Sequence, residues 1–294
     1  MDTQYRDKKI LLNIEKLKHY GAKTVTEQSE LFENISTIKD ASDNFHTNFF
    51  LSFDKLTSWI IKKRVLICSD SSTILVIYVR EEYAQIYFWS NDLNGLELLL
   101  MHVVNHIDMT FLVDMVYKDV EWLNDKIFFI LDKCGFSKHM TLERMSKVNM
   151  PDDVGEIKGI EFAEKEDAQE IQDILFQNFD IYGMQIPDIE EIEQASINHD
   201  IIISREGTTI AALFWTEHIG QTSHFRYWIA RPECRATGLY GYYVYMQTLN
   251  REARARRIIL WVLDNNKEVI DSHKLQGFSF DGLKDDIFLR KIDV

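Results

Sequence analysis

The sequence predicts an α/β protein with two similar halves, each a mixed sheet covered by helices on both faces. Three observations support this prediction. The length of 294 residues fits two domains of roughly 150 residues each. Strand-like and helix-like patterns alternate along the chain, and the series in the first half recurs in the second. Only 3 prolines and 12 glycines are present, without any low-complexity tract, so the whole chain is expected to fold.

The repeat is clearest at the end of each half. Asn124 opens a helical pattern that ends at Gly135-Phe136, and Asn266 opens another that ends at Gly277-Phe278. Asparagine and glycine are separated by the same number of positions in both halves, and the letters GFS recur. A pair of strands is expected after each helix, within SKHMTLERMSKV in the first half and up to DIFLRKI in the second.

Upstream of these helices the halves match element by element. In the first half we expect a helix over 53–62, strands over 65–68, 74–80 and 85–89, a helix over 93–106 and a strand over 109–115. In the second half we expect a helix over 189–198, strands over 201–204, 209–217 and 224–230, a helix over 239–253 and a strand over 258–263. An additional strand (160–163) and helix (167–178) precede the second series. Each half therefore has the order αβββαβαββ, and the domains are predicted to span 1–150 and 151–294, with the boundary near Pro151.

The composition excludes several classes of partner. The net charge of −14 would repel a polyanion, so neither nucleic acid nor an anionic membrane is expected to bind. The polar start MDTQYRDKKILL and the absence of any run near about 18 apolar residues predict a cytoplasmic protein. Cys68, Cys134 and Cys234 lie far apart without a CxxC pair or a nearby histidine, so no disulfide and no metal site is expected.

The most specific segment is YWIARPECRATGLYGYYVYM, residues 227–246. It begins as an apolar strand that Pro232 stops, continues as a short loop with Arg235 and Gly238, and enters a helix. Such a loop leaves backbone N–H groups free at a helix N-terminus, where the helix dipole favours an anion. Because Gly238 has no side chain, the backbone can approach a phosphate closely, and a pyrophosphate fits the first-turn amides. These amides belong to Leu239, Tyr240 and Gly241.

With these residues the segment resembles the cofactor motif of the GNAT acetyltransferase superfamily. That motif is a strand, a proline with an acidic residue, arginine or glutamine, two residues, glycine, any residue, and glycine or alanine. Pro232-Glu233, Arg235 and Gly238 match it, whereas Tyr240 stands at the final small-residue position and Gly241 follows. The resemblance implies two tandem GNAT-like domains, acetyl-CoA or coenzyme A as co-substrate, and no metal.

The resemblance also implies roles for individual residues. In the superfamily this strand splays from its neighbour and offers backbone groups to the pantetheine arm, while the loop holds the pyrophosphate. The later signature is asparagine, a helix, and a tyrosine four residues before Gly-Phe. His273 stands at the tyrosine position, where the resemblance implies protonation of the departing thiolate, and an imidazole with a near-neutral pKa can do this. The implied cofactor-binding residues are Trp228, Ile229, Ala230, Arg235, Ala236, Thr237, Gly238, Leu239, Tyr240, Gly241 and Asn266, with the Ile229 amide as oxyanion donor.

Two further groups of residues are candidates for the acceptor side. Glu217 and His224 stand at strand ends that flank the expected cleft, where either would serve as the base for an incoming ammonium. The alternative is that both are ordinary polar residues at strand ends. A second group lies where the superfamily walls its acceptor site and would favour a cationic amine, although a solvated helix face explains it equally well. This group is Asp180, Tyr182, Glu190 and Glu193.

The first half keeps the pattern of elements but lacks the motif. Only SND separates Trp89 from the helix at Leu93, and Leu131 stands where His273 stands in the second half. The first half is therefore predicted to be a degenerate copy with a packing or lid role. The predicted function is transfer of an acetyl or acyl group from acetyl-CoA to a small-molecule or peptide amine. The alternative is a non-catalytic module that binds coenzyme A or another protein.

Overall fold

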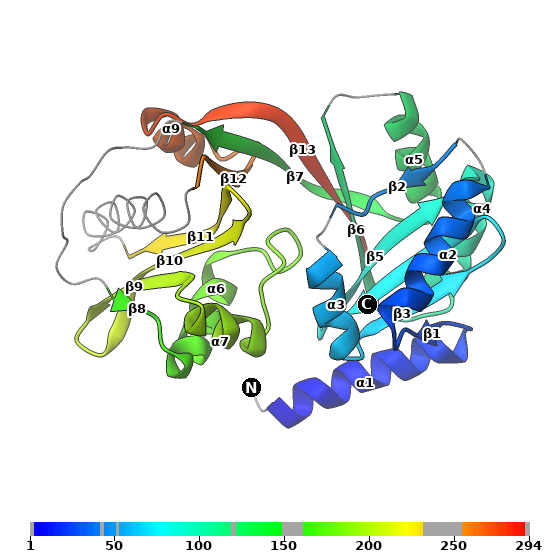
Figure 1. Cartoon of the computed structure of the whole chain (residues 1–294), viewed down its shortest axis with the longest axis horizontal. Coiled ribbons are helices and arrows are strands. Elements are labelled where there is room, and N and C mark those ends of the chain that lie inside the picture. Colours follow the sequence, from blue (N-terminus) through cyan, green and yellow to red (C-terminus); the bar gives the residue numbers. More distant parts are fainter. Residues whose placement is uncertain are drawn as a thin grey trace. The chain divides into compact units, whose positions relative to one another are not determined.

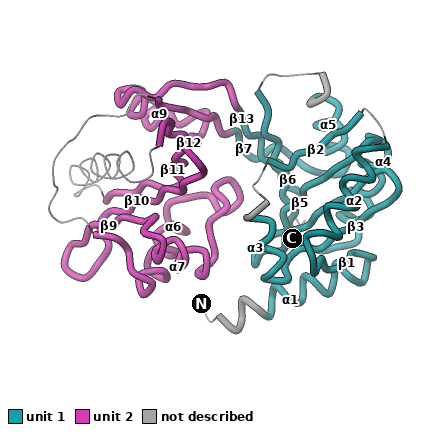
Figure 2. Tube along the Cα trace, viewed as in Figure 1, with its two compact units in different colours: residues 1–141, 284–294 teal, residues 142–283 magenta. Residues whose placement is uncertain are grey.

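The computed structural model describes residues 3–41, 44–50, 53–118, 122–148, 161–231 and 255–291 (Figure 1). The chain forms two compact units (Figure 2). Unit 1 consists of residues 1–141 and 284–294, and unit 2 consists of residues 142–283. The expected linker around Pro151 lies outside the described residues.

Unit 1 contains a mixed sheet with the strand order β1-β3-β4-β5-β6-β13-β7, and β2 pairs with β5 off this path. Most of its neighbouring strands are antiparallel, but β5 and β6 run parallel. Its elements are α1 (Thr3–His19), β1 (Lys23–Thr24), α2 (Gln28–Asp40), β2 (His46–Thr47), α3 (Phe53–Ile61), β3 (Val65–Ser69), β4 (Thr73–Val79), β5 (Tyr83–Ser90), α4 (Leu93–Asn105), β6 (Thr110–Tyr117), α5 (Trp122–Lys133), and parts of β7 (Ser137–Lys147) and β13 (Ser279–Arg290).

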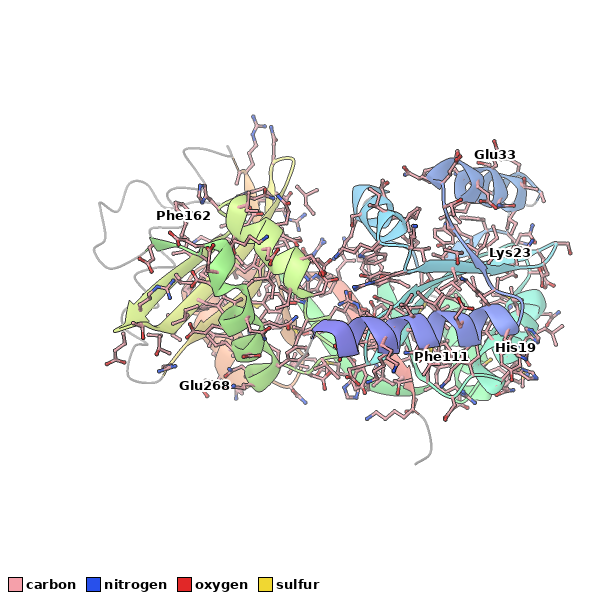
Figure 3. All side chains as sticks on the ribbon, turned by 90° about the horizontal axis from the view of Figure 1, so that it is seen from below. His19, Lys23, Glu33, Phe111, Phe162 and Glu268 are labelled. Atoms are coloured by element: carbon pink, nitrogen blue, oxygen red, sulfur yellow. The ribbon has the colours of Figure 1, made fainter. Side chains whose placement is uncertain are left out.

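Helices cover both faces of the unit 1 sheet, so its central strands are apolar on both sides. Along β4, Leu75 and Ile77 join the core under α1, α4 and α5, whereas Val76 and Tyr78 join the core under α2 and α3. This alternation follows from the two-residue period of a strand. Trp59 of α3 stacks on Tyr78 with ring centroids 3.9 Å apart. Figure 3 shows the side chains that fill these layers, including Phe111 of β6, which is fully buried.

Unit 2 has the strand order β13-β7-β12-β11-β10-β9-β8. Here α9 packs on one face of the sheet and α6 with α7 on the other, each over its own apolar cluster. The helix expected over 239–253 lies outside the described residues. The remaining elements are β8 (Glu161–Phe162), the 3-10 helix η1 (Lys165–Asp167), α6 (Ala168–Asn178), α7 (Ile189–Ile197), β9 (Ile201–Glu206), β10 (Thr209–Ile219), β11 (Thr222–Ala230), β12 (Arg257–Leu263) and α9 (Lys267–Leu275).

The strands and helices predicted within the described residues are found within a few residues of their expected bounds, but two predictions need correction. A single long strand, β7 or β13, follows each Gly-Phe instead of a strand pair. In β13 the Asp281-Gly282 dipeptide resembles a hairpin turn, yet Gly282 takes a φ of 88° and the strand continues. The strand and helix heading the second series are also not additional, because β1 and α2 stand at the same place in unit 1.

The two long strands explain why each unit draws on both halves of the sequence. In unit 1, β6 pairs antiparallel with Lys284–Arg290 of β13. In unit 2, β12 pairs antiparallel with Leu142–Lys147 of β7. Each sheet therefore obtains the neighbour of its last parallel strand from the other half of the sequence.

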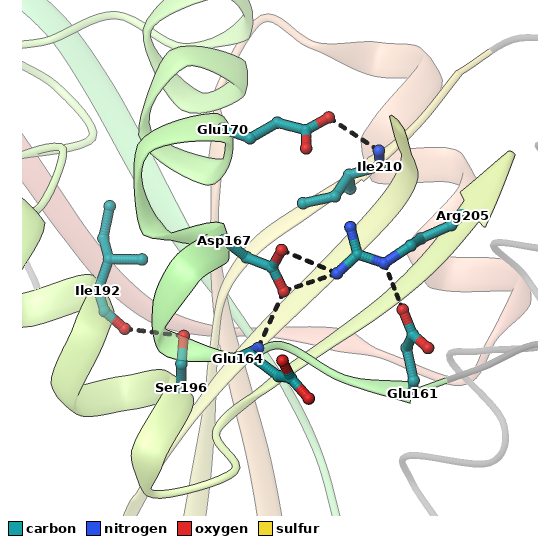
Figure 4. A network of polar contacts seen from close by, with 8 residues as sticks. All are labelled: Glu161, Glu164, Asp167, Glu170, Ile192, Ser196, Arg205 and Ile210. Carbon is teal, nitrogen blue, oxygen red and sulfur yellow. Dashed lines mark hydrogen bonds and ion pairs between the residues drawn. The ribbon is translucent and has the colours of Figure 1, made fainter. Parts of the chain in front are cut away.

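A polar network fixes the first helices of unit 2 to the edge of its sheet (Figure 4). Arg205 of β9 donates from Nη2 to both carboxylate oxygens of Asp167, at 2.8 and 2.7 Å, and from Nε to Glu161. Asp167 also accepts from the backbone N–H of Glu164 at 2.9 Å, which completes a capping box. Because Asp167 is buried, Arg205 is the counter-charge that makes its position tolerable.

Replacing Arg205 is therefore expected to destabilise unit 2. Arg205→Met leaves the buried Asp167 carboxylate unpaired, which should lower the free energy of unfolding by about 2 kcal/mol in urea denaturation followed by tryptophan fluorescence. The control is Lys165→Met, which removes an exposed pair with Glu193 and should cost at most about 0.5 kcal/mol. Equal effects of the two variants would contradict the role given to Arg205.

Candidate active site

The candidate site is an opening between β11 and β12, the two parallel strands of unit 2. Their ladder covers only four residue pairs, from Thr222 opposite Arg257 to Phe225 opposite Leu260. Both strands continue further, β11 to Ala230 and β12 to Leu263. On its other edge β11 stays paired with β10 as far as Ala230. Within the described residues, the edge of β11 beyond Phe225 thus has backbone groups that β12 does not pair.

A β-bulge lies where this opening begins. In the β10–β11 ladder Trp215 pairs with Tyr227 and the next residue, Thr216, pairs with Phe225, so Arg226 is the extra residue on β11. A bulge bends its strand and increases the local twist. The bend accounts for the separation of β11 from β12 beyond Phe225, and it turns the Arg226 side chain toward the same face as Trp215 and Tyr227.

Arg226 places a largely buried positive charge at the opening, and it was not among the residues predicted from the sequence. Its Nη1 donates to Glu217 at 2.6 Å, and its guanidinium lies 5.4 Å from the centroid of Trp215 and 5.3 Å from that of Tyr227. Burial alone would lower the pKa of Arg226, but the charge of Glu217 and its other neighbours raise it above the usual value. The signal available in the sequence was an arginine within an otherwise apolar strand end, FRYWIA.

Glu217 and His224, the two predicted bases, are neighbours at the closed end of the opening. They are paired across the β10–β11 ladder, so their side chains share one face of the sheet. The backbone of His224 also pairs with Ile259 of β12, one pair before the ladder ends. Because the Glu217 carboxylate already accepts from Arg226, it would have to leave that ion pair to take a proton.

His273 lies on α9, beside the opening. Its ring is nearly buried and lies 5.9 Å from the ring of Trp228 on β11 and 5.6 Å from that of Phe278. The structure therefore brings His273 and Trp228 together. Burial lowers the pKa of His273 to about 4, so the expected near-neutral pKa is wrong. At pH 7 this imidazole is neutral, and no partner for its buried Nδ1 is found among the described residues.

Three other predicted residues make structural contacts. Asn266 is the N-cap of α9, and its Oδ1 accepts from the backbone N–H of Val269 at 3.3 Å. Asp180 accepts from the backbone N–H groups of Tyr182 and Gly183, at 3.0 and 2.8 Å, and so shapes the connection between α6 and α7. Glu193 forms an ion pair with Lys165 at 3.0 Å.

Tyr227 holds the α6–α7 connection against the sheet. Its hydroxyl donates to the carbonyl oxygen of Met184 at 2.8 Å. Its ring packs edge-on against Phe179 at 5.3 Å. The connection therefore lies on the same face as Arg226 and Glu217, the face where an acceptor would approach the opening.

The predicted phosphate loop lies outside the described residues, as do the flanking residues Pro232 and Glu233. The structure describes Trp228, Ile229 and Ala230 on β11, where the opening lies. In the described part of the chain, no group of histidine, cysteine and acidic residues is arranged to hold a metal, and no helix is long and apolar enough to span a membrane. Outside the described residues are Arg235, Ala236, Thr237, Gly238, Leu239, Tyr240 and Gly241.

The burial of His273 predicts a pH-dependent stability. Between about pH 4 and pH 6.5 the unfolded chain binds a proton at His273 that the folded chain does not, so the free energy of unfolding falls as the pH falls through this range. His273→Phe removes this contribution. We therefore compare the free energies of unfolding of the variant and the parent. Their difference should change by about 3 kcal/mol between neutral pH and about pH 4.

Urea denaturation at several pH values measures this difference. The exposed His106→Phe variant is the control for introducing a phenyl ring. A difference between His273→Phe and the parent that is the same at all pH values would contradict a buried, neutral imidazole.

Comparisons with known proteins identify the fold. No protein-family model and no curated protein matches the chain. Among solved structures, it is similar to a GCN5-related N-acetyltransferase from Sphaerobacter thermophilus, with TM-score 0.54 and 10% identity over 85% of this chain and 96% of that one. A tandem GNAT protein from the clavulanic acid biosynthesis pathway gives 0.56 and 7%, over 93% and 99%. A GNAT-family acetyltransferase from Colwellia psychrerythraea gives 0.52 and 10%, over 92% and 99%.

At these identities the likeness shows the fold. The chain is an α/β protein with a tandem GNAT fold, and the predicted fold class is confirmed. The predicted degeneracy of the first copy and the cofactor loop of the second remain predictions.

Proposed function

We propose that this protein is an N-acetyltransferase that moves an acetyl group from acetyl-CoA to an amine, with its site in unit 2. The observation that carries the proposal is the opening between β11 and β12, whose ladder ends at Phe225 while both strands continue. This opening has His273 on one side and the Glu217–His224 pair at its closed end. Such a combination of exposed strand edge and titratable groups is typical of a site rather than of a packed core.

The residues present fit the proposed cofactor. An extended chain with amide groups, such as a pantetheine arm, would lie along the edge of β11 and bond to the backbone at Trp228 and Ala230, because Ile229 between them pairs with Leu213 of β10. The cofactor supplies the activated acyl group as a thioester.

The predicted oxyanion donor, the Ile229 N–H, needs correction. The Arg231 N–H donates to the Ala211 carbonyl at 3.0 Å, and the alternation of an antiparallel ladder then turns the Ile229 N–H toward Leu213 of β10. A backbone N–H on the other edge of β11 would stabilise the oxyanion that develops on the acyl carbonyl, because a fixed backbone donor needs no reorganisation. The phosphates would bind at the amides of residues 236–241.

His224 is the better candidate for the base. Glu217 faces it across the ladder but its carboxylate is held by Arg226, and imidazole is the side chain that most often serves as a general base. Glu217 and Arg226 then form an ion pair without net charge beside the acceptor site. An amine approaching from the α6–α7 connection would lose its proton to His224, directly or through water.

His273 would act on the leaving sulfur as a neutral imidazole. A neutral ring donates one N–H hydrogen bond, which stabilises a thiolate without a proton being held beforehand. A negative sulfur nearby would raise the pKa of the ring and so favour proton uptake from solvent. Trp228 fixes the ring in place from the side of β11.

A second candidate is a module that binds coenzyme A without catalysis. The observation that favours it is the low pKa of His273, about 4, since a proton donor for the thiolate would then be missing at neutral pH.

Thiol release from acetyl-CoA with a panel of amines distinguishes the two functions. His224→Ala should lower kcat/KM by about 100-fold because the amine then lacks its base, while calorimetry should give an unchanged Kd for coenzyme A. The exposed His218→Ala, on the same hairpin, is the matched control and should retain turnover. His273→Ala should also reduce turnover.

Tight binding of coenzyme A without turnover across the whole panel would favour the non-catalytic module. No heat with coenzyme A, acetyl-CoA or longer acyl forms would contradict both functions.

A further inference from the structure

Unit 1 has an opening of the same kind as unit 2. Its parallel strands β5 and β6 pair only at Tyr83–Gln85 with Thr110–Leu112, yet β5 continues to Ser90 and β6 to Tyr117. Beyond this short ladder, backbone groups on the facing edges of both strands need other partners.

The chain itself supplies these partners. Strand β2 adds to the free edge of β5, with His46 opposite Ser90 and Thr47 opposite Trp89. The next residue, Asn48, is 5% exposed. Asn48 Nδ2 donates to the carbonyl oxygens of Ile86 and Asp114, both at 3.0 Å, and its Oδ1 accepts from the N–H of Phe88 at 2.7 Å.

One side-chain amide thus bridges β5 and β6 in the plane of the sheet. Ile86 and Phe88 belong to β5, whereas Asp114 belongs to β6. Asn48 therefore bonds like the peptide group of an additional strand placed between the two. Phe49 follows it, and its ring lies 4.9 Å from Trp89 and 5.4 Å from Tyr87, which keeps the segment seated.

The corresponding connection in unit 2 takes a different course. Strand β2 lies between α2 and α3, whose counterparts in unit 2 are α6 and α7. Residues 179–188 between α6 and α7 form turns and coil without a strand, and Met184 of this connection meets β11 through the Tyr227 hydroxyl. Residues 179–188 thus do not form a strand on β11 as β2 does on β5.

We infer that residues 46–48 of unit 1, named here the strap, occupy the place that a cofactor arm takes in a unit of this fold. The strap closes the opening of unit 1 to coenzyme A. Asn48 is its positioning residue, because it alone bonds to both strands. The inference rests on the function proposed above for unit 2, and it predicts that each chain binds one equivalent of coenzyme A.

The polar floor of the unit 1 opening supports the same inference. Gln85 Nε2 donates to the Asp114 carboxylate at 2.7 Å, and both side chains are fully buried. This internal amide–carboxylate pair joins β5 and β6 where their ladder ends. Opening the strap would leave Phe88 N–H, Ile86 C=O and Asp114 C=O without these bonds.

Amide hydrogen exchange on the full chain tests the strap without any ligand. In the parent protein the Phe88 amide should be among the protected ones. Asn48→Ala removes its acceptor, so its exchange should be about tenfold faster, the change expected for one hydrogen bond. Asn48→Asp keeps an acceptor but loses both donors, so it should protect Phe88 better than Asn48→Ala does.

The control is Asn34→Ala on α2, where a partly exposed asparagine donates to a carbonyl of its own helix, that of Glu30. This variant should leave Phe88 protected. Fast exchange of Phe88 in the parent, or equal rates in the parent and Asn48→Ala, would overturn the inference. The parent measurement decides it even if Asn48→Ala does not fold.

Calorimetry with coenzyme A gives the second readout. One equivalent per chain supports the inference, and two equivalents overturn it. Complete absence of binding would contradict the function proposed for unit 2, while the exchange of Phe88 would still decide whether the strap closes unit 1.

Discussion

The structure depends on one constraint: two parallel strands that stop pairing leave backbone polar groups that need partners. Both units contain such a point, at Gln85 in β5 and at Phe225 in β11. In unit 1 the chain satisfies these groups itself, through β2 and Asn48. In unit 2, β12 does not pair with β11 beyond Phe225, and no other described strand takes its place there. The two units therefore differ in the connection between two corresponding helices, α2–α3 in unit 1 and α6–α7 in unit 2.

Electrostatics at the unit 2 opening follow from what is buried there. Arg226 is tolerated at a bulge because Glu217 neutralises it and two aromatic rings cover it. His273 is buried beside the rings of Trp228 and Phe278, and this burial keeps its imidazole neutral at pH 7. The neutral His273 imidazole thus donates a hydrogen bond more readily than a proton. A charged imidazole would instead bring a proton to the site.

Most helices and strands could be predicted from the sequence, because the two halves share glycines at equivalent helix ends. Gly135 and Gly277 end their helices with positive φ, at the same place in each unit. The exchange of β7 and β13 was not predictable, since a strand pattern does not say which half it will pair with. The strand pair expected after each Gly-Phe was wrong, because in β13 one strand continues past Gly282, whose positive φ would also suit a turn. Arg226 and the low pKa of His273 depend on burial, which only tertiary packing determines.

The pairing of β6 with β13 has a consequence for biosynthesis. Phe111 meets Arg290, so the inner neighbour of β6 leaves the ribosome only after all of unit 2 has been made. Until then Thr110–Tyr117 has a bare edge, the kind of surface that invites aggregation or capture by another strand. Unit 1 cannot complete its sheet until β13 has been made. The two units therefore complete their folding together, although each has its own core.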